Sequence, residues 1–433
     1  MQLKLRLKAG SSFSNIATIA SGSAIAQAAS LLFSPILTRI YAPTAYALFA
    51  VFTSQVSAIS PGVGGRFELA SIVESQREIR HALIALSLLA ALIVSVVYVL
   101  VLQFNLEWFV AAVGAQSLGG WIWFVPVALL GSGAINSLRA ICNSQDSYRV
   151  LSASSVVQSI GFTGLALLLA SASRQGGALV SAFLLSTVVT VFHLTWTIAP
   201  FKRLRVVLLD QVINYKQLLK VAKQYKDYPL VSAPMSVANG VMSAMPLLFL
   251  SAHYPVEIVG QYSLMARIGG APFSLFYDAI SRVQMKAISS DINDGRDPSV
   301  SLIRWATRLL AIVLVPTIIA VVFAPSVFAI VFGERWRDAG RFLRIAMPGL
   351  AVQFVVSSLS MSWVALGNVR TPAKWQAASL FLTFVACTWG ATFRDVEAFL
   401  FVLVSKDVFL YSAYFLLLVI ECRKTDPQKM TQV

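Results

Sequence analysis

Long apolar segments limit what this chain can fold into more than any other feature. A helix needs about 20 mostly apolar residues to cross the hydrocarbon core of a bilayer. We expect twelve such spans, at residues 13–38, 45–63, 82–103, 121–142, 151–171, 177–199, 229–252, 259–284, 305–324, 342–366, 375–392 and 398–420. Only 12% of the residues are charged, about half the share in a soluble protein. The sequence therefore predicts an all-α polytopic membrane protein.

The positions of lysine and arginine predict the orientation of these spans, because cytoplasmic loops retain positive charge. With the N-terminus inside, 25 of the 34 Lys and Arg residues fall in cytoplasmic segments and 7 in outer segments. This bias favours an even number of spans with both termini cytoplasmic. It also explains the net charge of +15 as a consequence of topology, so no nucleic-acid partner is expected.

Cysteine and histidine are sparse and scattered. Cys142, Cys387 and Cys422 lie far apart and form no CxxC pair, and the three histidines lie far from one another in sequence. Metal sites and disulfide frameworks need such residues at close, regular spacing. We therefore expect packing roles for the cysteines, no metal and no cofactor.

The longest loop, at residues 201–228, is expected to be a cytoplasmic amphipathic linker. Four lysines recur there at helical spacing, with Leu218, Leu219 and Val221 between them; they are Lys216, Lys220, Lys223 and Lys226. A solvated basic face and a short interfacial helix on the anionic inner leaflet are both compatible with this pattern.

An internal repeat relates the two halves of the chain. Polar residues line one helical face of the first and seventh spans, with the spacing 4, 3, 4 in both; they are Ser23, Gln27, Ser30, Ser34 and Thr38, and Ser232, Ser236, Asn239 and Ser243. In lipid, such a face should turn toward protein or a water-filled cavity.

The loop after each of these spans repeats as well. Tyr41 is followed six residues on by Ala47 and eight on by an aromatic residue, and Tyr254 is followed in the same way by Gly260 and Tyr262. The two patterns imply offsets of 209 and 213 residues, one helical turn apart. We expect a parallel duplication, with one six-helix lobe over residues 1–200 and a second over 229–433, which surround a central cavity and rock to give alternating access.

Several motifs resemble those of the bacterial Wzx-type oligosaccharide flippases, which belong to the multidrug/oligosaccharidyl-lipid/polysaccharide exporter superfamily. The first runs from Ser34 to Pro43 (SPILTRIYAP) and continues at Phe67 (FELASIV). Further similar motifs are GQYSLMAR from Gly260 and FGERW from Phe332. The chain departs from the family at Ala47, where glycine is usual, which could alter helix packing slightly.

The resemblance implies two six-helix lobes and a flippase that is not an enzyme. Such proteins move undecaprenyl-diphosphate-linked repeat units from the inner to the outer leaflet of the bacterial inner membrane, for O-antigen, capsule or exopolysaccharide assembly. The implied partners are the lipid-linked oligosaccharide, inner-membrane lipids, and a polymerase and chain-length regulator of the same pathway.

Ionisable groups inside spans are the first candidates for a path for such an anionic head group. Arg267, Arg39 and Lys406 could meet phosphate or an acidic sugar, although snorkelling of Arg39 and pairing of Lys406 with a carboxylate are alternatives. Asp407 is adjacent to Lys406 but is expected to point about 100° away on the helix. Polar and aromatic groups complete the expected binding set: Gln27, Asn239 and Tyr262.

Arg66 and Glu68 end the second span at the cytoplasmic side. They form either an inner gate or a local ion pair. Asp278 lies eleven residues after Arg267 and is a candidate for ion coupling. The chain has no GxxxxGK[ST] motif, so we expect no nucleotide hydrolysis and no catalytic residues.

Two alternatives stay open at this stage. A drug exporter of the same superfamily would share the fold but favour an acidic cavity, whereas Arg267 and Lys406 favour an anionic cargo. A polysaccharide polymerase or ligase usually carries a large outer loop, and the longest outer loops expected here, at about 104–120 and 325–341, are short.

Overall fold

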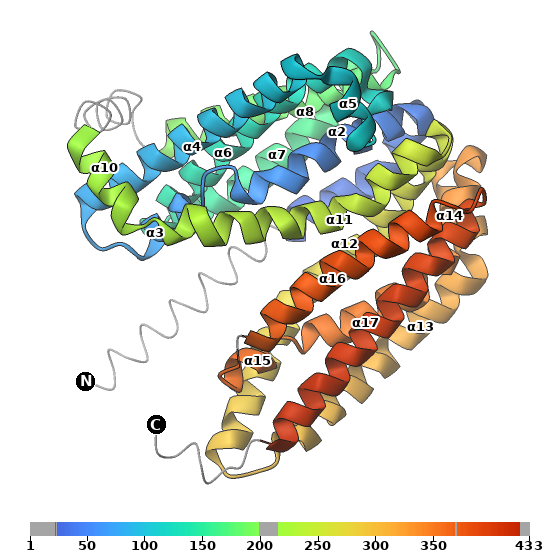
Figure 1. Cartoon of the computed structure of the whole chain (residues 1–433). Coiled ribbons are helices and arrows are strands. Elements are labelled where there is room, and N and C mark those ends of the chain that lie inside the picture. Colours follow the sequence, from blue (N-terminus) through green and yellow to red (C-terminus); the bar gives the residue numbers. More distant parts are fainter. Residues whose placement is uncertain (1–21, 23, 199–214, 369, 425–433) are drawn as a thin grey trace. The chain divides into compact units, whose positions relative to one another are not determined.

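The computed structural model describes residue 22 and residues 24–198, 215–368 and 370–424, and these parts are helical almost throughout (Figure 1). The chain divides into two compact units, Met1–Ala252 and His253–Val433. The all-helical membrane architecture expected from the sequence is confirmed.

Unit 1 begins with the helix Ala24–Ile40. The helices that follow are α2 (Pro43–Ile59), α3 (Phe67–Val73), α4 (Arg77–Phe104), α5 (Leu106–Ala112), α6 (Val125–Ser144), α7 (Tyr148–Leu169), α8 (Gly176–Ile198), α10 (Tyr215–Gln224) and α11 (Ala233–His253). A 3-10 segment, η2 (Gln116–Phe124), leads into α6. Within this unit α4 packs against α6, α6 against α8, and α7 against α8.

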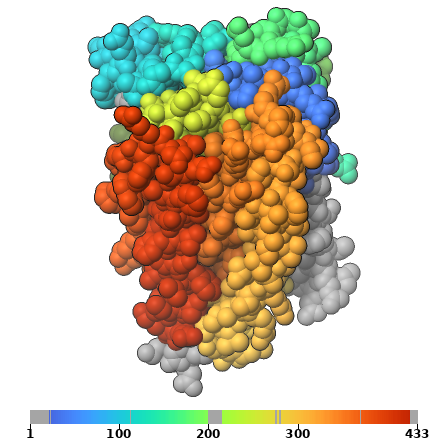
Figure 2. Space-filling view, turned by 90° about the vertical axis from the view of Figure 1, so that its right-hand side faces the viewer, coloured from blue at the N-terminus to red at the C-terminus, as the bar shows by residue number. Residues whose placement is uncertain are grey.

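Unit 2 is built around one central helix. Its helices are α12 (Val256–Asn293), α13 (Pro298–Phe332), α14 (Arg337–Ser358), α15 (Ser362–Ala365), α16 (Arg370–Gly390) and α17 (Val396–Lys424). Helix α14 packs against α12, α13 and α17. Helix α13 shows many apolar side chains on its outer side, among them Ile312, Val315 and Ile319, and unit 2 presents a closely packed face there (Figure 2). Such a surface suits contact with lipid.

Among the described residues, eight helices are long and apolar enough to cross a membrane, or nine if one bent pair counts as a single span. Helices lie at the positions of all the expected spans. The helix Ala24–Ile40 is too short to meet the length requirement, and α12 and α16 are not apolar enough. The count of twelve therefore stays a prediction.

The second expected span is broken. Its two parts, Pro43–Gly62 and Phe67–Val73, meet at an angle of 47°. The break is made by left-handed backbone at Gly65 (φ 61°) and Arg66 (φ 60°). Glycine adopts this conformation readily, but a residue with a side chain seldom does, and such residues often mark functional sites.

The tyrosines of the repeated loops occupy matching places in the two units. The Tyr41 hydroxyl donates to the carbonyl oxygen of Ala166, near the end of α7, at 2.7 Å. The Tyr254 hydroxyl donates to the carbonyl oxygen of Phe393, just after α16, at 2.7 Å. Helices α7 and α16 lie at the expected fifth and eleventh spans, so this pairing supports the offset of 213 residues for the loops.

Helix α10 docks on unit 1 instead of standing apart. Val221 is buried in a cluster with side chains of α3 and α4, including Phe67 and Leu83. The Tyr225 hydroxyl donates to the Glu74 carboxylate at the end of α3. The four lysines of the expected basic face are exposed. Residues 201–214 of the expected linker lie outside the described residues.

Helix α11 belongs to the first compact unit, so the units divide one helix later than the lobe boundary expected at residue 229. This helix approaches α2 closely at Gly240, where an added Cβ would lie 2.3 Å from the carbonyl oxygen of Ala58. A π-helical turn, η3 (Tyr228–Ser232), leads into α11. The expected lobes at 1–200 and 229–433 remain a prediction.

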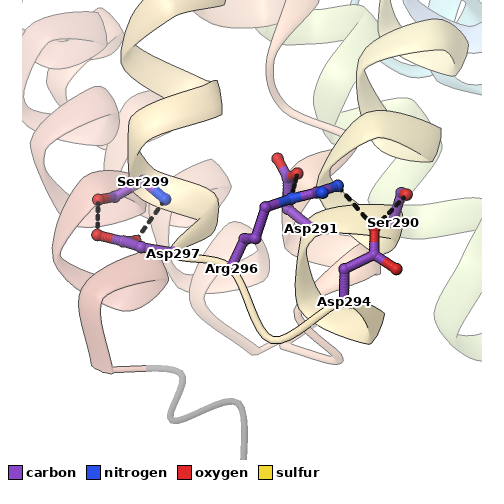
Figure 3. A network of polar contacts seen from close by, with 6 residues as sticks. All are labelled: Ser290, Asp291, Asp294, Arg296, Asp297 and Ser299. Carbon is purple, nitrogen blue, oxygen red and sulfur yellow. Dashed lines mark hydrogen bonds and ion pairs between the residues drawn. The ribbon is translucent and has the colours of Figure 1, made fainter.

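A polar network fixes the turn between α12 and α13 (Figure 3). Arg296 pairs with Asp291 at 3.0 Å and with Asp294 at 2.6 Å. Asp297 accepts a hydrogen bond from the backbone N–H of Ser299 at 2.8 Å and so caps the start of α13. These contacts hold the two long helices as a hairpin.

Candidate cationic site

A cavity of about 380 Å³ opens in unit 1 beside the break in the second span. Its lining comes from the broken span, from α6 and from α7; the polar members are Ser60, Arg66, Glu68, Asn136, Arg139 and Asn143. The sequence placed Arg66 and Glu68 together at this end of the span, and in the structure both line this cavity. Their role as an inner gate stays a prediction.

The broken backbone positions Arg66. One guanidinium nitrogen, Nη1, donates to the carbonyl oxygen of Pro61 at 3.3 Å. The Nε–H group is buried and has no hydrogen-bond partner. A buried donor without a partner is costly, so the protein itself leaves this guanidinium only partly satisfied.

Glu68 is held by hydroxyl groups. Its carboxylate is buried and accepts a hydrogen bond from Ser87 Oγ at 3.2 Å, and Ser87 in turn accepts one from Ser137 Oγ at 2.9 Å. The turn leaves little space here, because a Cβ added at Gly64 would lie 2.7 Å from Glu68 Oε2. Glu68 forms no ion pair with Arg66 in the described structure. Its carboxylate is held by Ser87 and not by a local ion pair.

Arg139 is a site residue that the sequence did not single out. Its Nε donates to Ser154 Oγ at 3.1 Å and its Nη2 donates to Gln158 Oε1 at 3.0 Å. Both partners are neutral, so the positive charge of Arg139 is not cancelled by them. The available signal was the spacing of Asn136, Arg139 and Asn143, which places all three on one face of α6.

Together these groups make a cationic site. Two guanidinium groups face one carboxylate, and two carboxamides add neutral donors and acceptors. Arginine binds phosphate and carboxylate groups through paired hydrogen bonds. The chemistry of this lining therefore suits an anionic ligand.

Lys406, in contrast, is already paired. Its Nζ lies 2.5 Å from Asp407 Oδ1 and donates to Thr383 Oγ1 of α16 at 3.1 Å. The expectation that Asp407 points away from Lys406 was wrong, because two flexible side chains on adjacent helix positions can turn toward each other. Lys406 thus follows the carboxylate-pairing alternative, and its role in substrate binding remains a proposal.

The other expected binding residues are spread over both units. Gln27 and Arg39 lie on the first helix of unit 1, while Tyr262 and Arg267 are half-buried on α12 of unit 2. Asn239 is exposed on α11, where it lines an open cavity of about 640 Å³ with Ser232 and Ser236 of the polar stripe. Asp278 lies on α12, but its side chain is outside the described part. A single cavity that gathers these residues remains a prediction.

Two of the recognised motifs meet through Gln261. Its Nε2 donates to the carbonyl oxygen of Arg335 at 2.6 Å, and its Oε1 accepts from the backbone N–H of Ala339 at 3.0 Å. The side chain is buried. These motifs therefore serve to fasten α12 to the start of α14.

Within the described residues, no group of three or more His, Cys, Asp or Glu side chains could hold a metal ion. The three cysteines are buried as free thiols.

Solved structures of a flippase and of transporters share this helical fold. The fold is similar to that of the lipid II flippase MurJ in an inward closed conformation, with a TM-score of 0.69 at 12% identity over 95% of this chain and 90% of that one. An inward-facing multidrug resistance MATE transporter of the MOP superfamily gives 0.62 at 14% identity over 94% and 96%. A MOP superfamily transporter from Pyrococcus furiosus gives 0.51 at 13% identity over 95% and 96%.

The chain belongs to the polysaccharide biosynthesis protein family, whose model matches residues 36–341. No curated protein matches the chain in sequence. The resemblance to flippases of the exporter superfamily is thereby confirmed. The structural relatives named above are a flippase and transporters.

Proposed function

We propose that this protein is a flippase for undecaprenyl-diphosphate-linked oligosaccharide repeat units. It moves them from the inner to the outer leaflet of the bacterial inner membrane by alternating access, with both termini in the cytoplasm. The products feed O-antigen, capsule or exopolysaccharide assembly, where a polymerase and a chain-length regulator act next. The polysaccharide biosynthesis family and the MurJ-like fold support this assignment.

The observation that carries the proposal is the cavity with Arg66 and Arg139. An anionic head group loses its hydration when it leaves water, and the loss is prohibitive without compensating charge and hydrogen bonds. Arg66 has a buried donor without a partner, and Arg139 is bound only by neutral groups. Both are suited to accept a diphosphate at the cytoplasmic end of unit 1, while the lipid tail stays in the bilayer.

The wider binding path is proposed to include Arg267, Arg39, Lys406, Gln27, Asn239 and Tyr262. Glu68 and Arg66 act at the inner gate. Glu68 and Asp278 are the candidates for ion coupling, since the chain has no nucleotide-binding motif and transport must draw on an ion gradient or on substrate flux.

A drug exporter with the same fold is the main alternative, because a multidrug transporter is among the structural relatives. Many exported drugs are cations, and the cavity beside Arg66 would repel them. A polymerase or ligase is less well supported, since the structural relatives are transporters and flippases.

Deletion of the gene in the producing bacterium tests the proposal. The expected result is loss of surface polysaccharide and accumulation of single lipid-linked repeat units on the inner leaflet. The wild-type gene should restore export, and Arg66→Ala should not. Accumulation of single units on the outer leaflet would favour a polymerase. Normal polysaccharide together with drug sensitivity would favour an exporter.

A further inference from the structure

Unit 2 contains a cavity of about 310 Å³ whose chemistry differs from that of the cationic site. It lies between α12 and α14, and both of its walls belong to unit 2. The lining residues are Gly270, Phe273, Tyr277, Leu350, Gln353, Phe354 and Ser357. None of them is charged.

Neutral hydrogen-bonding groups cluster on one side of this cavity. The Tyr277 hydroxyl lies 3.3 Å from Ser360 Oγ. Gln353 and Ser357 lie close to the hydroxyl of Tyr411 on α17. A carboxamide and hydroxyl groups can each donate and accept hydrogen bonds, so this side can meet a ligand that does both.

Aromatic rings form another part of the wall. Phe273 and Phe354 pack with ring centroids 5.0 Å apart and planes tilted by 34°. Trp375 packs on Tyr411 behind them, with centroids 5.5 Å apart. At Gly270 a Cβ would meet no heavy atom within 4 Å, so the cavity is open above this residue.

We propose that this cavity binds one neutral sugar ring of the cargo. This inference rests on the proposed function and deepens it. A pyranose ring has apolar C–H faces that pack on aromatic rings, and its rim of hydroxyl groups donates and accepts hydrogen bonds. Gln353, Ser357 and Tyr277 match the rim, while Phe273 and Phe354 match the face.

Other occupants fit less well. An acyl chain would make no use of the hydrogen-bonding groups of Gln353, Ser357 and Tyr277. A diphosphate would find no cation among the described residues of the lining. A flat aromatic drug could use the rings but would leave much of the hydrogen-bonding side unmatched.

Binding to the purified full chain in lipid nanodiscs tests the proposal with two probes. One is the oligosaccharide released by mild acid from the host's own lipid-linked repeat unit, and the other is undecaprenyl diphosphate without sugar. Gly270→Leu should occupy the cavity, because a Cβ at this position meets no heavy atom within 4 Å. We expect it to weaken oligosaccharide binding by about tenfold or more, while undecaprenyl diphosphate binding changes less than about twofold. Arg66→Ala should show the reverse pattern.

Gly164→Leu on α7 is the matched control, because a Cβ there also meets no heavy atom within 4 Å. It should bind both probes as the wild type does. Gln353→Ala removes hydrogen-bonding groups without adding bulk, and it should also weaken oligosaccharide binding selectively. If Gly270→Leu misfolded and bound neither probe, the affinities of Gln353→Ala for the two probes would test the inference instead.

Wild-type oligosaccharide affinity in both Gly270→Leu and Gln353→Ala would overturn the inference, and so would equal loss of both probes in Gln353→Ala. Binding of an aromatic drug such as ethidium that is lost in Gly270→Leu, without any oligosaccharide binding, would assign the cavity to drugs. If the wild type bound neither the oligosaccharide nor undecaprenyl diphosphate, the proposed function itself would fail, which is a distinct result.

Discussion

The Tyr41 hydroxyl is bonded to the backbone carbonyl of Ala166, 125 residues away, at 2.7 Å. Tyr254 makes the corresponding bond to Phe393 in the other unit. Each tyrosine joins the loop before one helix to the far end of another that is distant in sequence. The repeated tyrosine therefore makes the same kind of long-range hydrogen bond in both halves of the chain.

Tyr41→Phe should destabilise the protein by about 1 kcal/mol, because it removes a buried hydrogen bond. The Ala166 carbonyl keeps only its helical bond from the Ala170 N–H, at 3.1 Å. Tyr254→Phe should have a similar effect. Thermal unfolding in detergent would measure both. Tyr215→Phe is the control, since Tyr215 is largely exposed on α10. Equal melting temperatures for all three variants would contradict a fastening role.

Arg139→Ala should reduce export of surface polysaccharide by about ten- to hundredfold, since a charge-assisted hydrogen bond contributes about 1.5–3 kcal/mol. Arg139→Lys keeps the charge but loses the paired geometry, and it should fall between the alanine variant and the wild type. Export can be measured as polymer on whole cells, with membrane levels of the protein checked by immunoblot. Arg149→Ala, an exposed arginine on the neighbouring helix, should export normally.

Arg267→Ala should abolish polymer export while the protein still inserts in the membrane. The residue is half-buried on α12, where a positive charge can serve an anionic cargo. Arg282→Ala is the control, because Arg282 is exposed on the same helix, and this variant should export normally. Full activity of Arg267→Ala would remove this residue from the proposed path.

Lys406 and Asp407 should behave as a pair. Removing one partner of a semi-buried ion pair leaves the other charge uncompensated, whereas apolar replacement of both is often tolerated. We expect Lys406→Met and Asp407→Leu each to lower the melting temperature more than the double variant does. If the double variant were as unstable as the sum of the two single variants, the pair would not be coupled.

The contact between Glu74 and Tyr225 should make docking of α10 depend on pH. The hydrogen bond from Tyr225 lowers the pKa of the Glu74 carboxyl, so its contribution is present above the unfolded value of about 4.3 and is lost as the pH falls through the lower folded pKa. The same bond raises the pKa of Tyr225 to about 12. The contribution of the phenol is complete below its unfolded value of about 10 and is lost as the pH rises through about 12.

Amide hydrogen exchange of α10 at several acidic pH values would measure this effect. Protection should fall at low pH in the wild type. In Tyr225→Phe, protection should be lower already at neutral pH and should change less on acidification. An identical profile in both proteins would show that the packing of Val221 alone holds the helix.

The sequence predicted the helices well because apolar segments of membrane length have few alternatives. It also predicted that Arg66 and Glu68 lie close together, because they are only two positions apart at the end of one span. Arg139 was missed because it lies near the end of the expected span 121–142, where its charge was counted only as evidence of orientation; α6 continues to Ser144. The pairing of Lys406 with Asp407 depends on side-chain rotamers, which helical spacing does not determine.

The sequence could not locate the break in the second span either. The segment from Pro61 to Arg66 contains glycines, but their spacing does not show that Arg66 itself takes a left-handed conformation. Nor could it show that α11 packs with the first unit, because this depends on a close approach between Gly240 and Ala58. Both features are set by tertiary contacts.

The burial of Cys142, Cys387 and Cys422 has a practical consequence for experiment. A membrane-impermeant thiol reagent should leave the native chain unmarked, so a cysteine introduced at an exposed position would report its side of the membrane against a silent background. Lys220→Cys on α10 and Arg174→Cys in the loop after α7 would make a suitable pair. Opposite labelling of the two in intact cells and in inverted vesicles would give the topology directly.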